Sequence, residues 1–391
     1  MVLQFLRNAS EQAVAEEKAS KAGPVIAFHG AGRPVWSGRD IGSVTRSGFV
    51  GNPVGFRCVK MIAEAAAAVP MVLQDSERRF DVHPMLRLLE RPNGAQGRAD
   101  LLEALYGQLL LSGDGYLEAA GHDEMGQPCE LYVLRSDRMK VVPGKDGWPV
   151  AYEYAVGARK VQFSMQGNVT PVCHVKAFHP SDDHYGLSPM QAAANAVDVH
   201  NAACKWSKAL LDNAARPSGA IVYKGGEGAT LGADQYSRLV DEIESNHQGA
   251  RNAGRPMLLE GGLDWKPMGF SPSDMEFQKT KESAAREIAL AFGVPPMLLG
   301  LPGDNTYANY AEANRAFYRL SILPLVDKVS AAVSDWLSDS YGEVLRWKPD
   351  LDAVPALALE REAQWKRIAG AEFLSVAEKR RMLGLPAQAD E

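Results

Sequence analysis

Eight side chains of metal-binding types gather between residues 173 and 204. Cysteine, histidine and aspartate are common ligands of Zn²⁺, and His200 and Cys204, four residues apart, would share one face of a helix. The spacings match no standard zinc pattern, so ligand type alone supports the site. A metal-dependent hydrolase therefore stays one alternative, which depends on the fold bringing these residues together. The set is Cys173, His174, His179, Asp182, Asp183, His184, His200 and Cys204.

The sequence patterns of the common catalytic and nucleotide sites are missing. GKDG (144–147) and GGEGAT (225–230) lack the Gly-Lys-Ser/Thr ending with which a P-loop holds phosphates. GLSPM (186–190) lacks the second glycine of a nucleophile elbow, since Met190 stands at that position. Neither a His-Glu-x-x-His motif nor a dinucleotide fingerprint occurs. The sequence thus predicts no enzyme activity and no cofactor.

The composition is that of an ordinary globular protein with a slight acidic excess. The 391 residues are 46% hydrophobic and 23% charged, and 42 basic against 48 acidic side chains give a formal charge of -6. This balance argues against a broad basic face that grips nucleic acid. Four cysteines at unrelated spacings indicate reduced thiols in the cytosol, and we expect neither a signal peptide nor a membrane span.

The first half of the chain predicts an α+β region that follows a loosely ordered arm of about 50 residues. Helices are expected at 53–68 and at 100–111, the second ended by Gly113. A strand is expected at 70–74. Further short strand signals separated by Gly, Asp and Pro predict a meandering antiparallel sheet. These are GYLEAA, ELYVL, MKVV, VAYEYAV, KVQFSM and HVKAF.

A long helix is predicted from about 189 to 213. Ser188 is a suitable N-cap and Pro189 suits the first helical position. At 1.5 Å per residue such a helix would be about 37 Å long. Its apolar residues advance in steps of three and four and form one stripe of mainly small side chains, which a neighbouring helix could approach closely. The stripe consists of Ala192, Ala196, Val199, Ala203, Trp206 and Leu210.

The second half predicts an insert between two helices and then a third, interrupted helix. The insert, 216–270, contains a strand, a helix at 233–247 and a further strand pair. The following helix ends near Phe292, and the polar loop Gly-Asp-Asn-Thr separates it from a helix of about 309–340. Pro324 should kink that helix or break its hydrogen-bond ladder locally. A strand, EVLRWKP, and a helical stretch of about 355–383 come last.

Four motifs, in this order, resemble the portal proteins of tailed bacteriophages, in the siphophage-type branch that also occurs in prophages and gene transfer agents. The resemblance covers about residues 50 to 385. Its motifs are LLLSGDGYLEAAGHDEMGQPCELYVLRSDRMKVV, HPSDDHYGLSPMQAA, LLEGGLDWKPMGFSPSDMEFQKTKESAAREIALAFGVPPMLLG and FLSVAEKRRMLGLP.

The resemblance implies an α+β portal-protein fold that assembles as a ring. Its regions would be an N-terminal arm (1–49), a wing (50–187), a first stem helix (188–215), a clip (216–270), a second stem helix (271–293), a tunnel loop region (294–308), a long kinked wing helix with a strand (309–354) and a short crown with the C-terminal tail (355–391).

The resemblance also implies a function and partners. Twelve subunits would surround a channel for double-stranded DNA, which passes without sequence specificity. The ring would stand at the portal vertex of the virion, beside the major capsid protein, after assembly in the host cytoplasm. It would bind the terminase large subunit and later the head–tail adaptor proteins. A capsid or tail-adaptor protein without a channel role stays open as an alternative, distinguished by the presence of a central hole.

The resemblance assigns candidate residues to three of these tasks. The tunnel loop would contact DNA through Gly303, Asp304, Asn305, Thr306 and Tyr307. The clip helix would bind the motor and the adaptors through Asp241, Glu242 and Glu244. The stem would pack against neighbouring subunits through Ala192, Ala196, Val199, Ala203 and Trp206.

Overall fold

The structure is a computed structural model, and most of the chain between residues 36 and 386 is described in it. The chain divides into two compact units, Met1–Trp36 and Ser37–Glu391, and every helix and strand described belongs to the second. The described residues are 36–166, 170–212, 219–223, 232, 234–235, 237–238, 241, 263–267, 277–302 and 307–386. The predicted arm therefore lies largely outside them, as do residues 255–262, where one strand of the further pair in the insert was expected.

The first elements are α1 (Ile41–Val44), the π-helical turn η1 (Thr45–Val50) and α2 (Pro53–Ala67). The prediction of a helix at 53–68 is confirmed. The expectation of a loosely ordered arm is wrong for 41–50, which are helical. Contact with later parts of the chain orders them, because Gly48 lies against Met190 and the Ser47 carbonyl accepts a hydrogen bond from Asn201.

Next along the chain are β1 (Met71–Gln74), β2 (Arg79–Phe80), α3 (Pro84–Glu90) and α4 (Arg98–Ser112). Helix α4 ends as predicted, because Gly113 takes the left-handed conformation, with φ +83°. The main hydrophobic core lies among α2, α4 and the later helices α8 (Phe277–Ala291) and α10 (Leu323–Tyr341). Its fully buried side chains include Ile62, Leu73, Met85, Leu105, Leu117, Leu131, Ile288 and Ile322.

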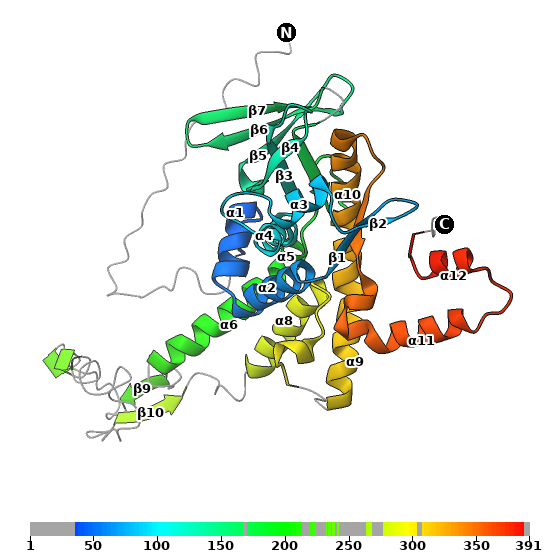
Figure 1. The fold of residues 1–391 in the computed structure, drawn as a ribbon. Coiled ribbons are helices and arrows are strands. Elements are labelled where there is room, and N and C mark those ends of the chain that lie inside the picture. The colour runs from blue at the N-terminus through cyan, green and yellow to red at the C-terminus, as the bar shows by residue number, and fades with distance from the viewer. Residues whose placement is uncertain are drawn as a thin grey trace, which may run out of the picture. The chain divides into compact units, whose positions relative to one another are not determined.

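The six predicted strands of the wing region all form, but as two three-stranded antiparallel sheets. They are β3 (Asp114–His122), β4 (Pro128–Leu134), β5 (Met139–Pro143), β6 (Pro149–Val156), β7 (Arg159–Ser164) and β8 (Val172–Lys176). The sheet orders are β4-β3-β8 and β5-β6-β7 (Figure 1). A second, smaller core joins the two sheets through Tyr116, Leu134, Met139, Val141, Tyr152 and Val172.

The long helix predicted at 189–213 is present with one interruption. It consists of α5 (Pro189–Ala192) and α6 (Ala194–Asp212), which are separated at Ala193. The Ser188 side chain accepts a hydrogen bond from the Gln191 amide, as an N-cap should. Helix α8 (Phe277–Ala291) packs along α6 (Figure 1). In the predicted insert, β9 (Gly219–Tyr223) pairs with β10 (Leu263–Pro267).

The third long helix is interrupted where proline was expected to act. Helix α9 (Tyr307–Phe317) passes through the π-helical turn η5 (Tyr318–Ile322) into α10 (Leu323–Tyr341). Pro324 has no amide to donate to the preceding turn, and the widened turn absorbs that loss. Beyond it, β11 (Arg346–Pro349) pairs with β1, and α11 (Ala358–Ala369) and α12 (Val376–Met382) end the described chain.

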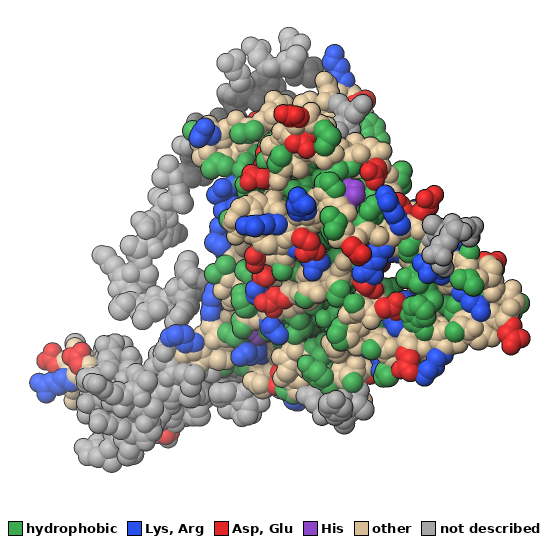
Figure 2. Space-filling model, in the orientation of Figure 1, with side chains coloured by type: hydrophobic (Ala, Val, Ile, Leu, Met, Phe, Trp, Pro, Cys, Tyr) green, Lys and Arg blue, Asp and Glu red, His purple; other side chains and the backbone are tan. Residues whose placement is uncertain are grey.

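Charged side chains of both signs are interspersed over the face shown in Figure 2. No helix in the described part of the chain is long and apolar enough to cross a membrane.

Two glycines allow the end of α4 to meet the segment that leads into α5. A Cβ atom added at Gly186 would lie 2.0 Å from the Gly113 carbonyl oxygen, and one added at Gly113 would lie 2.4 Å from the Gly186 carbonyl carbon. These separations are far below van der Waals contact, so only glycine permits the approach. The start of the long helix is thereby held against the end of α4.

We expect Gly186→Ala to lower the free energy of unfolding by roughly 2–4 kcal/mol, because the methyl group forces the two backbones apart. The measurement is chemical denaturation of the purified protein. Gly107→Ala within α4 is the matched control: its Cβ would meet no atom within 4 Å, and it should stabilise by up to about 1 kcal/mol. Equal effects of the two substitutions would contradict the close approach.

Candidate functional site

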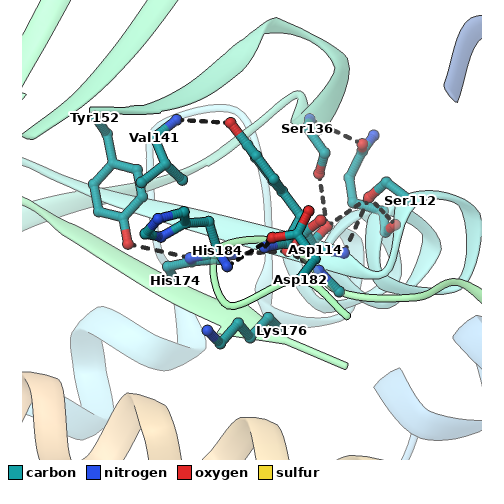
Figure 3. Close-up of polar contacts among 12 residues, drawn as sticks. Ser112, Asp114, Ser136, Val141, Tyr152, His174, Lys176, Asp182 and His184 are labelled. Carbon is teal, nitrogen blue, oxygen red and sulfur yellow. Dashed lines mark hydrogen bonds and ion pairs between the residues drawn. The ribbon is translucent and has the colours of Figure 1, made fainter. Parts of the chain in front are cut away.

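His174, one of the eight candidate metal ligands, belongs to a buried hydrogen-bonded cluster (Figure 3). His174, in β8, lies opposite Tyr116 of β3, and its ring stacks on that of Tyr116 with centroids 4.2 Å apart. Its Nε2 lies 2.8 Å from Oδ1 of Asp114, and its Nδ1 lies 3.1 Å from the hydroxyl of Tyr152. A neutral ring protonated on Nε2 satisfies both partners, donating to the carboxylate and accepting from the hydroxyl.

Asp114 also connects three backbone segments. Its Oδ1 accepts a hydrogen bond from the Gly186 amide at 2.9 Å. Its carbonyl accepts from the hydroxyls of Ser112 at 2.8 Å and Ser136 at 2.6 Å. The cluster thus joins the end of α4, the start of β3 and the segment before α5. Burial raises the pKa of Tyr152 to about 12, so its hydroxyl stays protonated as this arrangement requires.

Asp182, ahead of the long helix, stabilises a turn. The Asp182 carboxylate accepts from the amides of His184 at 2.8 Å and Tyr185 at 3.0 Å. The His184 amide contributes most to holding the pKa of Asp182 below its usual value. The Tyr185 hydroxyl accepts from the Val141 amide of β5 at 2.9 Å, which ties this turn to the second sheet.

The remaining members of the set also have structural contacts. The His179 ring accepts from the Ser181 amide. The thiol of Cys173 is buried and points to the Ala332 carbonyl, and that of Cys204 lies 3.9 Å from Nδ1 of His200. Within the described residues no group of three or more His, Cys, Asp or Glu could hold a metal ion. The eight candidate ligands all lie in this part, and the fold distributes them over separate contacts.

A second polar cluster, which the sequence did not predict, fixes α6 on the start of α2. Asn52 caps α2 by accepting from the amides of Val54 and Gly55, and its side-chain amide donates to Nδ1 of His200 at 3.1 Å and to the Asn201 oxygen at 2.9 Å. The order Asn52-Pro53 signals an N-cap, but nothing local to it identifies partners 148 residues away. Both Asn52 and His200 are buried.

The five stem residues, one in α5 and four in α6, differ in burial. Ala196 and Ala203 are buried inside their own subunit, and Ala192 is exposed. Val199 and Trp206 are partly buried, and the Trp206 ring stacks on Phe277 of α8 with centroids 3.8 Å apart. Part of the predicted stripe therefore packs against the second helix of the same chain.

The predicted tunnel loop lies mostly outside the described residues, which begin again with Tyr307 as the first residue of α9. Hydrogen bonds hold the residues between α8 and the loop in place. The Arg286 guanidinium of α8 donates to the Pro302 carbonyl. The Ser321 hydroxyl of η5 donates to the Gly293 carbonyl at 2.6 Å, which joins the chain just after α8 to the helix that follows the loop.

Of the three predicted clip residues only Asp241 is described. It is exposed and helical, as are four neighbours between 234 and 238, which agrees with the helix expected at 233–247. Glu242 and Glu244 lie outside the described residues.

Comparison with known proteins gives one family. The profile of the family described as phage portal protein matches residues 53–384. A protein of Rickettsia bellii is 40% identical over 339 residues, covering 86% of this chain and 87% of that protein. The probable portal protein of Streptomyces phage phiC31 is 27% identical over 317 residues, covering 76% of this chain and 66% of that protein.

Similar chains also occur in solved structures of gene transfer agent particles. A chain in the neck of an empty GTA particle, computed with C6 symmetry, is 69% identical, with a TM-score of 0.72 over 92% of this chain and 97% of that one. A chain in the neck of the native particle, computed with C12 symmetry, is 68% identical, with a TM-score of 0.69 over the same shares. GTA stands for gene transfer agent.

The His200 cluster predicts a dependence of stability on pH. Burial, helped by the charge of Lys281, holds the pKa of His200 below its ordinary value of 6.5. As pH falls through 6.5, the unfolded chain takes up a proton that the folded chain resists, so this group's contribution to stability is lost on acidification. A protonated Nδ1 also could not accept the hydrogen bond of Asn52.

We therefore expect the unfolding free energy to fall more between pH 7.5 and 5.5 in the wild type than in His200→Asn, in which the amide oxygen can replace Nδ1 as acceptor. The difference should be up to about 1 kcal/mol. Denaturant titrations at both pH values measure it. Identical pH dependence of the two proteins would contradict the lowered pKa.

Proposed function

The chain belongs to the phage portal protein family and is a portal protein of a phage or gene transfer agent particle; we propose that twelve copies form a ring around a channel for double-stranded DNA. The observation that carries the proposal is the chain of the particle neck computed with C12 symmetry, which is 68% identical over 92% of this chain. At such identity, surfaces that join subunits are expected to be largely shared as well as the fold.

The stem pair α6–α8 supports this assembly. In a cyclic ring, one face of each subunit meets a different face of the next. Ala192, Val199 and Trp206 retain exposed surface on the α5–α6 helix that a neighbouring subunit can cover. Ala196 and Ala203, also assigned to ring packing, pack inside their own subunit, so their replacement by glutamate would disturb the subunit and the ring together.

The loop Gly303–Tyr307 is proposed to reach the channel and touch the duplex. The contacts of Arg286 with Pro302 and of Ser321 with Gly293 fix the chain before it. Its side chains carry no positive charge. Each neutralised phosphate would add affinity, and hence friction, for a duplex that has to move.

Docking of other particle proteins is assigned to the region between the stem helices. The antiparallel strand pair β9–β10 and the helical residues up to Asp241 belong to this clip. The proposed partners are the terminase large subunit during packaging and head–tail adaptor proteins afterwards, with the major capsid protein around the vertex. The subunit is structural in this proposal, and a separate motor supplies the energy. Assembly would take place in the host cytoplasm.

The ring itself is tested by measuring the mass of the purified assembly and averaging its electron micrographs. We expect a closed particle of twelve subunits with a central hole. A monomer, or an assembly without a hole, would contradict the channel and favour a capsid or tail-adaptor protein.

The loop is tested by Asp304→Lys in a reconstituted packaging reaction. One added lysine in each copy places a set of cations at one constriction, and their phosphate contacts should slow packaging several-fold. Added salt should relieve the defect because it weakens those contacts. The measurement is packaged DNA length against time at two salt concentrations, with Asp304→Asn as the control. Wild-type rates for the lysine variant at both would show that the loop does not touch DNA.

A further inference from the structure

Three cations share the outer face of the sheet β11-β1-β2. Residues that lie directly opposite each other in an antiparallel pair have their side chains on the same face. Arg346 of β11 lies opposite Gln74 of β1, and Gln74 lies opposite Arg79 of β2. Lys348 is two residues beyond Arg346 in β11, so its side chain is on this face too. We call Arg79, Arg346 and Lys348 the cation cluster.

The opposite face of the sheet belongs to the main core. Leu73 and Trp347 form a pair on that face, and both are buried. On the outer face Arg79 and Arg346 are exposed, and Lys348 is partly buried. The sheet therefore presents its cations to solvent, and two of the three lie on the edge strand β11.

The positive charge of the cluster is only partly neutralised. Arg79 pairs with Asp350, with 3.1 Å between nitrogen and oxygen. Neither Arg346 nor Lys348 has a carboxylate partner among the described residues. Partial burial and then the charge of Arg346 hold the pKa of Lys348 below its usual value of 10.5. Like charges that interact in this way disfavour each other, and the fold of the sheet does not require them.

The end of α12, which lies beside this sheet (Figure 1), accounts for one of the three cations. The Lys348 ammonium donates to the Gly384 carbonyl just after that helix, where a cation is favourable. Arg346 makes no such contact in the described part of the chain. The last turn of α12 adds three more basic side chains next to this junction: Lys379, Arg380 and Arg381.

Phosphate groups are the ligands that this chemistry fits. A guanidinium group presents forked N–H donors that match phosphate oxygens, and an ammonium group adds charge. A small anion would need an enclosed site, whereas an open face with several cations suits a polyanion with repeated phosphates. Duplex DNA is the polyanion that the proposed function brings to this subunit.

The cation cluster is distant from the proposed channel loop. The Trp347 amide, next to Arg346, donates to the Ser334 hydroxyl of α10 at 2.8 Å. From Tyr307, where the loop ends, to Ser334 the helices α9 and α10 extend over roughly 40 Å. A duplex held at the cluster would therefore not be the segment that the loop contacts.

We propose that the cation cluster binds the phosphate backbone of duplex DNA outside the channel, without sequence specificity. The choice of this ligand rests on the proposed function. One cluster in each copy would let a ring hold DNA at several points, each of them weak. DNA would then be kept beside the ring without any added cation at the loop.

Covalently closed circular DNA separates this site from the channel, because a closed circle cannot be threaded through a closed ring. We expect the purified full-length protein to sediment with such circles. The affinity should fall steeply as salt is raised from about 50 to about 200 mM, because phosphate contacts release counterions.

Substitutions at Arg346 test the residues. Arg346→Gln should lower the affinity for closed circles roughly fivefold or more and reduce its dependence on salt, whereas Arg346→Lys, which keeps the charge, should retain most of the affinity. Lys140→Gln is the matched control, since Lys140 is also exposed and also lies on an edge strand, β5. It should bind like the wild type. Thermal unfolding should show that all three variants are folded.

The outcomes separate this inference from the ring. A wild-type protein that does not bind closed circles, or equal losses for Arg346→Gln and Lys140→Gln, would overturn the inference and leave the ring standing. Stronger competition by polyglutamate than by duplex DNA of equal charge would also overturn it, and would assign the cluster to an acidic protein. Subunits that bind circles through Arg346 but form no ring would support the phosphate site and overturn the proposed function.

Discussion

The carboxylate of Asp114 belongs to a residue that is 2% exposed, and burying a charged group costs on the order of several kcal/mol unless hydrogen bonds compensate. Two donors do so here: the His174 ring at 2.8 Å and the Gly186 amide at 2.9 Å. Removing either would leave the charge poorly satisfied, so the three groups hold one another in place. Because Gly186 leads directly into α5, this carboxylate determines where the long helix begins relative to the two sheets.

A second junction fixes the same helix further along. Asn52 serves as N-cap of α2 and as partner of His200 and Asn201 on α6, so one side chain determines both where α2 starts and how α6 lies on it. Helix α6 is thus held by α8 along its side, by η1 and by the N-cap of α2. For a subunit whose stem is proposed to line a ring, this restraint means that neighbouring copies meet surfaces that are already shaped.

The sequence predicted those features that depend on neighbouring residues. Gly113 ends α4, Ser188 and Pro189 begin α5, and Pro324 follows a widened turn, because caps and prolines act within a few residues. It did not predict the partners of Asp114 or Asn52, which lie 60 and 148 residues away. It also missed η1, whose order comes from contacts with α2 and α6. The histidine and cysteine set suggested a metal because buried polar networks and metal sites use the same residue types.

The charges of the described chain support a subunit past which a polyanion can move. Many cations lie beside carboxylates: Lys60 contacts both Glu64 and Glu103, and Arg361 is buried against Asp352. Such pairs add little stability when exposed, but they neutralise positive charge within a few ångströms. Binding of a duplex strengthens with each phosphate that a free cation neutralises. An acidic chain with a formal charge of -6, and with many of its basic groups already paired, therefore has weak attraction for DNA in general. In the proposed channel, passage would then depend on the size of the opening and on the few residues that reach it, not on the surface as a whole.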